Sequence, residues 1–146
     1  MNKKILKKNL QQLEKEFPNE ILPKEKLPLL SREKDFSNIP LKDLTIENLR
    51  FMINQGFGWK FLVPIAMGIL SQNPLADEDC YDSSLLSSVL RVKNSFWQDN
   101  LNLYHKVDEI LQVVENIETN EAKTILTIFL PQEIYDFRKN KPQNNG

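Results

Sequence analysis

The sequence predicts an all-α protein, and three observations support this fold class. Only four of the 146 residues are glycine, fewer than the many tight turns of an all-β protein usually require. Apolar residues recur every three or four positions in most segments, as on one helical face. No segment alternates apolar and polar residues between turn signals, as a half-buried strand would. We therefore expect a single-domain bundle of about six or seven helices around a buried central helix kinked by a proline.

Residues 1–42 are predicted to form an N-terminal helix and a proline-rich connection that pack on the same domain. Pro18 ends the helix. Residues 18–42 contain four prolines and are expected to be irregular, with at most a short turn of helix. The helix has four apolar residues on one face: Leu6, Leu10, Leu13 and Phe17.

The helical core is expected at residues 43–138. Its first helix has Thr45 as a plausible N-cap and Gly56 as a natural C′ residue. The next segment, from Gly58 to Leu70, is apolar nearly all round, which predicts the buried central helix. Pro64 removes one backbone donor and should kink this helix; it also disfavours a central strand.

Three further helices are predicted after the polar segment that follows Pro74. Asp82 is placed to cap a helix containing Leu85, Leu86, Val89 and Leu90. Ser95 and Gln98 match a capping box at the start of the longest helix. The last helix starts near Asn120 and is interrupted at Pro131, after which residues 133–137 form one further turn. The inner faces of the last two helices are Trp97, Leu101, Tyr104, Leu111 and Val114, then Ala122, Ile125, Leu126 and Phe129. Residues 139–146 are polar and predicted to be a disordered tail.

The net charge of −1 hides an uneven distribution. Residues 1–42 carry ten Lys and Arg against six Asp and Glu, residues 43–136 carry six against fourteen, and residues 137–146 carry three and none. An acidic body disfavours a nucleic-acid binder, which needs a basic patch on its folded part. It suits a protein with a basic partner, although solubility explains it equally well.

No catalytic residue, metal site or cofactor is predicted. His105 and Cys80 are the only residues of their kinds, whereas a zinc site needs three or four ligands. Asp77, Glu78 and Asp79 are adjacent and lack the central glycine of a calcium loop. No stretch approaches the ~20 apolar residues that span a membrane. The N-terminus lacks the apolar core of a signal peptide, so we expect a cytoplasmic protein that is not an enzyme.

A specific pattern stands in the central third of the chain. Residues 49–56 read LRFMINQG and residues 58–66 read GWKFLVPIA, followed by Leu70 and Asn73-Pro74. Farther along come Tyr81, Leu85, Leu86, Val89, Leu90 and Trp97. This pattern resembles the immunity proteins of bacterial contact-dependent growth inhibition (CDI) systems over roughly residues 10 to 115. The chain departs from the family at Asn54, where a glycine is usual, and at residues 82–84, where Pro-Gly-Asp is usual.

The resemblance implies a partner: the C-terminal toxin domain of a large secreted protein, often a nuclease, which the immunity protein binds and blocks. An RNase presents a basic cleft to phosphates, and acidic side chains can occupy that cleft. From the composition and the missing motifs we expect no cofactor, no membrane and no direct contact with nucleic acid. The hypothesised toxin-binding residues are Asp77, Glu78, Asp79, Asp82, Asp108, Glu109, Glu115 and Glu118.

Two other classes of protein remain open. A helical adaptor or regulatory interaction module unrelated to toxins would have the same composition. A gene for a large secreted protein with a toxin-like end immediately upstream would favour the immunity protein. The other class is a nucleic-acid binder or a small enzyme. An RNA-binding assay in a salt titration would test for the nucleic-acid binder.

Overall fold

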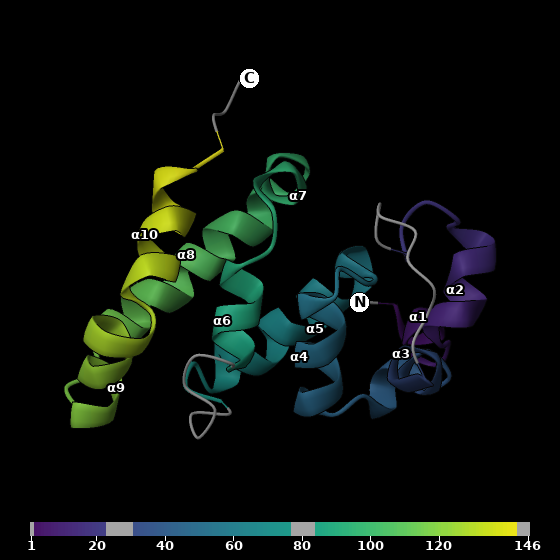
Figure 1. The fold of residues 1–146 in the computed structure, drawn as a ribbon, viewed down its shortest axis with the longest axis horizontal. Helices are drawn as coiled ribbons and strands as arrows, with labels where there is room; N and C mark the ends of the chain where they lie inside the picture. The colour runs from purple at the N-terminus through teal and green to yellow at the C-terminus, as the bar shows by residue number, and fades with distance from the viewer. Residues whose placement is uncertain (1, 23–30, 77–83, 143–146) are drawn as a thin grey trace. The chain divides into compact units, whose positions relative to one another are not determined.

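The computed structural model describes residues 2–22, 31–76 and 84–142, and for Ser31 and Arg32 the backbone alone. Every regular element in these residues is a helix (Figure 1), which confirms the all-α prediction. The chain forms two compact units, Met1–Ile65 and Ala66–Gly146. The described residues contain ten α-helices, more than expected, because predicted helices are divided and one was missed. The proposed division at residues 42 and 138 stays a prediction.

The first unit starts with two short helices, α1 (Lys3–Leu6) and α2 (Leu10–Glu16), where one helix was predicted. Asn9 separates them because it is the N-cap of α2. Its side chain accepts a hydrogen bond from the backbone N–H of Gln12, and the Gln12 side chain accepts one from the N–H of Asn9. This reciprocal capping box starts a new helix at residue 10. Helix α2 ends just before Phe17 and Pro18, as expected.

The segment predicted to be irregular contains a two-turn helix, α3 (Ser31–Ser37), and a 3₁₀ turn, η1 (Leu41–Asp43). The expectation of at most one short turn was therefore wrong. Tertiary packing accounts for the difference: the Phe36 ring meets the Phe51 ring edge-on, with centroids 5.3 Å apart. Phe51 belongs to the next helix, α4, so α3 is stabilised by a contact that no local pattern shows.

Helix α4 (Ile46–Asn54) has the predicted boundaries. Thr45 is its N-cap, in a capping box with Asn48 that was not foreseen. Gly56 follows the helix with φ 87°, the left-handed conformation that favours glycine at C′.

Helix α5 (Trp59–Gln72) contains Pro64 and is the predicted buried central helix. In the first unit its residues 61–63 are at most 4% exposed. Gly58, just before it, has φ 56°, and its N–H donates to the Ile21 carbonyl at 2.8 Å. A Cβ on Gly58 would stand 2.9 Å from Cδ2 of Leu10 in α2. Glycine thus allows both the turn into α5 and the close approach of α2.

The second unit continues α5 with the buried Ala66, Met67 and Leu70, followed by α6 (Leu85–Leu90). The N-cap of α6 is Ser84, whose hydroxyl accepts from the N–H of Ser87, and not Asp82 as predicted. All six residues of α6 are buried, so its two serines need internal partners. The hydroxyls of Ser87 and Ser88 both donate to the Ser84 carbonyl.

The predicted longest helix is divided into α7 (Asn94–Asp99) and α8 (Leu101–Glu115). The Ser95–Gln98 capping box was a wrong prediction, because α7 begins after Lys93 and both residues lie inside it. Asn100 makes the break: its side-chain amide donates to the Phe96 carbonyl at 2.8 Å, and its backbone leaves the helical region. The buried face of α8 is Tyr104, Val107, Ile110, Leu111 and Val114.

The chain then forms α9 (Asn120–Thr124), a π-helical turn η3 (Ile125–Phe129) and α10 (Pro131–Lys139). Ala122 and Ile125 are buried as predicted, whereas Leu126 and Phe129 are half-buried. Pro131 does not precede a single turn but starts a nine-residue helix from its first position, where proline is favoured. Among the described helices, none combines the length and hydropathy that a membrane crossing requires.

Gly58 and Gly68 give a matched test of backbone strain. Gly58→Ala should lower the free energy of unfolding by about 1–3 kcal/mol, because alanine would be strained at positive φ and would meet Leu10. Gly68→Ala, inside α5 with nothing within 4 Å of the new Cβ, should raise it by about 0.5–1 kcal/mol. Urea unfolding of both variants measures the difference, and effects of equal sign would contradict the role given to Gly58.

Candidate functional site

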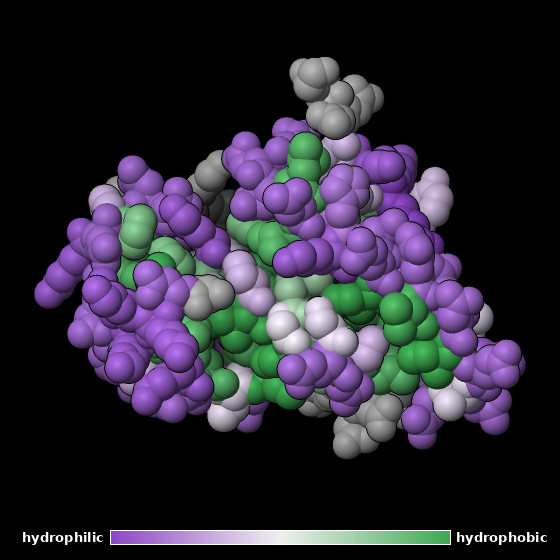
Figure 2. Space-filling model, turned by 180° about the vertical axis from the view of Figure 1, so that it is seen from behind, coloured by the Kyte–Doolittle hydropathy of each residue, from purple (hydrophilic) through white to green (hydrophobic). Residues whose placement is uncertain are grey.

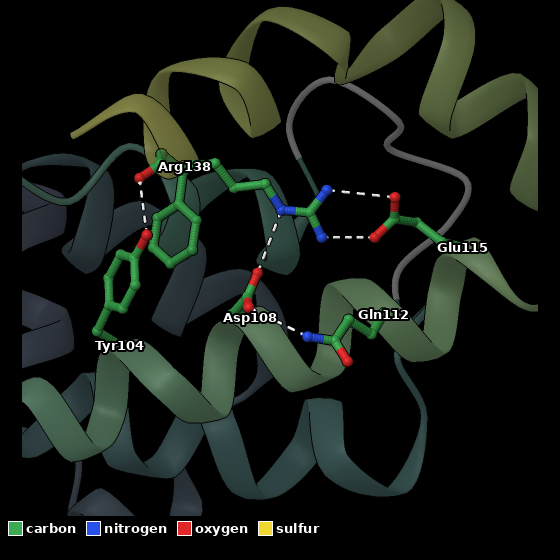
Figure 3. A network of polar contacts seen from close by, with 6 residues as sticks. Tyr104, Asp108, Gln112, Glu115 and Arg138 are labelled. Atoms are coloured by element: carbon green, nitrogen blue, oxygen red, sulfur yellow. Dashed lines mark hydrogen bonds and ion pairs between the residues drawn. The ribbon is translucent and has the colours of Figure 1, made fainter. Parts of the chain in front are cut away.

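A polar network joins α10 to α8 in the second unit (Figure 3). Arg138 donates from Nε to Asp108 at 3.1 Å and from its two terminal nitrogens to the two carboxylate oxygens of Glu115. Gln112 donates from its side-chain amide to the other oxygen of Asp108 at 3.1 Å. Asp108 and Glu115 are seven residues apart, two helical turns, so both lie on the side of α8 that meets α10.

An aromatic cluster lies beside this network. The Tyr104 hydroxyl donates to the Phe137 carbonyl at 3.2 Å, and the two rings are stacked with centroids 4.4 Å apart. The Trp97 ring meets Phe137 edge-on at 5.7 Å, and its indole N–H donates to the Val92 carbonyl. The apolar and the ionic contacts therefore fix α10 against the same face of α8.

The network changes the electrostatics of two of its members. The hydrogen bond to Glu115 raises the pKa of Arg138 above its ordinary value. Desolvation lowers this pKa, and the hydrogen bond to Asp108 raises it by a smaller amount. Burial raises the pKa of Tyr104, Asp108 raises it further, and Arg138 lowers it. Both groups therefore hold their protons more firmly in the folded protein than in the unfolded chain.

The hypothesised acids fall into three groups. Asp108 and Glu115 are partners of Arg138 inside the protein. Glu109 and Glu118 are exposed and form no ion pair with the residues described. The remaining four lie outside the described residues: Asp77, Glu78, Asp79 and Asp82. The toxin-binding role of all eight stays a prediction.

Sequence reasoning missed Arg138, which was counted only as part of a basic C-terminal end. The available signal was a pair of acids at i and i+7 beside the apolar face of the longest helix. An arginine in the last turn of a later helix is a natural partner for such a pair. Charge counting alone cannot separate acids that bind an internal cation from acids that face solvent.

Two further features of the second unit are His105 and a cleft beside α10. The described residues contain no cluster of three or more His, Cys, Asp or Glu side chains that could hold a metal. His105 is exposed on α8, with its ring against that of Tyr104 at 5.9 Å. A cleft of about 280 Å³ lies between the α6–α7 turn and α10, and the ion pair between Arg91 and Glu133 is on its lining. Of the hypothesised acids, Glu109 on α8 and Glu118 just before α9 are exposed without an ion pair to the described residues, so this surface is taken as the candidate functional site.

A family comparison identifies the kind of protein that carries this surface. The sequence model of the CDI immunity proteins matches residues 4–107. The chain belongs to the CDI immunity proteins. No curated protein and no solved structure matches it. The resemblance inferred from residues 49–97 is confirmed at the level of the family, which supports neutralisation of a CDI toxin as the general function.

The end of the family match has a structural meaning. It lies at Val107 in the middle of α8, one residue before Asp108. Most of the hydrophobic framework of this immunity protein is thus inside the matched segment. The ion-paired residues of the network lie beyond the match: Asp108, Glu115 and Arg138. So do Glu109, Glu118, α9, η3 and α10.

Replacing Arg138 by methionine should lower the free energy of unfolding by about 1–2 kcal/mol. The substitution keeps much of the aliphatic stem but leaves two carboxylates without their bidentate partner. Lys8→Met is the control, because Lys8 makes one contact with Glu16 and both side chains are well exposed. Its effect should stay below about 0.5 kcal/mol. Equal losses in urea unfolding would show that the Arg138 network adds no more than a surface pair.

The Tyr104 hydroxyl predicts a loss of stability at alkaline pH. Burial raises the pKa of Tyr104 above its ordinary value of 10.0 in the folded state, so the unfolded chain releases this proton at lower pH. Above about pH 10 the native state binds more protons than the unfolded state, and stability falls as pH rises. Lysines titrate in the same range, so the quantity to measure is the difference between the wild type and Tyr104→Phe. That difference should shrink as the pH rises above about 10; a constant difference would contradict the burial of the phenol.

Proposed function

We propose that this immunity protein binds the C-terminal toxin domain of a large secreted CDI protein in the cytoplasm and blocks it, and that this toxin is an RNase. The observation that carries the proposal is membership of the CDI immunity proteins over residues 4–107. The protein acts by binding alone, with no cofactor, metal or catalytic residue of its own. Its partner is a protein, not a nucleic acid or a membrane.

The distribution of charge supports a nuclease as the target. The first unit carries twelve basic and eight acidic residues, and the second carries seven and twelve. A nuclease needs cationic groups where it holds the phosphates of its substrate. An acidic protein surface can take the place of those phosphates, and opposite potentials also speed the encounter. The net charge of −5 on the second unit therefore suits a basic toxin.

The structure divides the acids into those available to a partner and those already engaged. Glu109 and Glu118 are exposed and are proposed to contact the toxin directly. Asp108 and Glu115 are proposed to act through the network with Arg138, which offsets much of their charge. Four acids of the segment 77–82 complete the proposed surface: Asp77, Glu78, Asp79 and Asp82. A stable interface of ordinary size would bury about 1,200–2,000 Å² in total, more than one helix face provides.

The direct test is co-purification with the toxin domain encoded immediately upstream, followed by an RNA-cleavage assay. An equimolar amount of this protein should abolish cleavage, and expression in the cytoplasm should restore growth to cells that produce the toxin. Affinity should fall as salt concentration rises, because charged surfaces meet. A tight complex that leaves RNA cleavage intact would contradict inhibition, and a toxin that cleaves no RNA would contradict the assigned substrate.

Charge reversal separates the two groups of acids. The double variant Glu109→Lys, Glu118→Lys should weaken binding by about tenfold or more and flatten the salt dependence. The matched control is Glu20→Lys, an exposed acid in the first unit for which no ion pair is found in the described parts of the chain. Its affinity should stay within about twofold of the wild type. An equal loss of affinity in the double variant and in Glu20→Lys would indicate a general effect of net charge.

A further inference from the structure

We propose that the outer surface of the α8–α9–η3 region recognises this chain's particular toxin, with Ile128 and Val113 as apolar anchors set among free acids. The proposal rests on the proposed function, because it names the partner as the toxin. It goes further by locating specificity on apolar side chains outside the segment that matches the family.

Ile128 is the first anchor because the π-helical turn holds a large apolar side chain in solvent. It is 68% exposed, in an otherwise apolar run from Ile125 to Leu130 interrupted only by Thr127. The N–H of Leu130 donates to the Ile125 carbonyl at 2.8 Å, the i to i+5 bond of a π-helix. Pro131 has no N–H to continue an α-helical pattern here. Single π-helical turns occur frequently at functional sites.

Val113 is the second anchor, on the solvent face of α8. It is 51% exposed, although the opposite face of the helix is buried. Glu109 precedes it by four residues and so lies on the same face. Helix α9 packs against α8, which brings the two anchoring segments into one part of the second unit.

The acids around the anchors define the chemistry of the partner. Glu109, Glu118 and Glu121 are exposed, and none of them pairs with a cation in the parts of the chain that the structure describes. Glu121 lies on α9, which leads directly into the π-helical turn that carries Ile128. These three acids outnumber the two exposed lysines of the same elements, Lys106 and Lys123, so a partner that fits should offer mainly cations around apolar depressions.

The location of exposed apolar groups supports a role in specificity. Four large apolar side chains are exposed in the described residues, and both proposed anchors, Val113 and Ile128, follow residue 107; Tyr135 does too, but it lies on α10, outside the proposed surface. In the view of Figure 2, one of several areas of hydrophobic surface lies toward the right, the side on which α9 lies in this orientation. Immunity proteins that share a framework must still discriminate among toxins, and that discrimination needs residues that are not shared.

Truncation of the anchors, measured on the complex with the toxin domain encoded immediately upstream, tests the proposal. Ile128→Ser should weaken binding about tenfold or more, mainly through faster dissociation, as for a central apolar anchor. Val113→Ser should weaken it by a smaller factor. Tyr135→Ser is the matched control in the same unit: its ring is 60% exposed but lies under the Lys139 ammonium at 5.8 Å. Its affinity should stay within about twofold. All three positions are exposed, so unchanged thermal unfolding confirms that each variant is folded.

Amide hydrogen exchange gives a second readout that needs no substitution. Toxin binding should slow exchange in residues 120–129 and in the second half of α8. If the wild type does not bind the toxin domain, the proposed function itself fails. If it binds and inhibits, but Ile128→Ser and Val113→Ser bind equally well and residues 120–129 gain no protection, the toxin uses another surface and this inference is overturned.

Discussion

The guanidinium of Arg138 reaches from the last turn of α10 to two carboxylates on α8, and the placement of α10 on α8 depends on that contact. Asp108 and Glu115 occupy its nitrogens from positions two helical turns apart, so α10 is held along a length of α8 and not at one point. The stacked rings of Tyr104 and Phe137 set the distance between the helices. A partly exposed ion pair alone contributes little to stability; a bidentate one beside an aromatic cluster contributes more and also fixes orientation.

The same contact determines what the protein presents to a partner. With Asp108 and Glu115 engaged on the flank toward α10, the opposite flank of α8 is free to face solvent. Glu109 and Val113 lie on that outer face, and α9 with its π-helical turn follows directly in the chain. The internal ion pairs thus engage two acids, and the outer face of α8 carries one acid, one lysine and one apolar side chain: Glu109, Lys106 and Val113.

The sequence predicted the helical class, the buried α5 and both ends of α4, because these follow from local periodicity and from Thr45 and Gly56. It failed where one polar side chain decides between two local structures. Asn9 and Asn100 break helices whose apolar pattern continues through them, since each forms a specific hydrogen bond. Pro131 could end one helix or begin another, and α3 depends on a contact between Phe36 and Phe51. Periodicity describes which residues can face a core but not where the backbone turns.

The candidate site was less predictable than the fold, for a related reason. Acidic excess after residue 42 is visible in the sequence, but the pairing of Asp108 and Glu115 with Arg138 depends on how α10 packs. The family match ends at Val107, so it describes the framework and not the surface beyond it. A protein that neutralises one toxin among related ones can keep its framework constant while its binding surface changes, since specificity is a difference between affinities. The residues beyond the family match are therefore where we expect the identity of the toxin to be read, and Arg138 fixes α10 against α8 within that part of the chain.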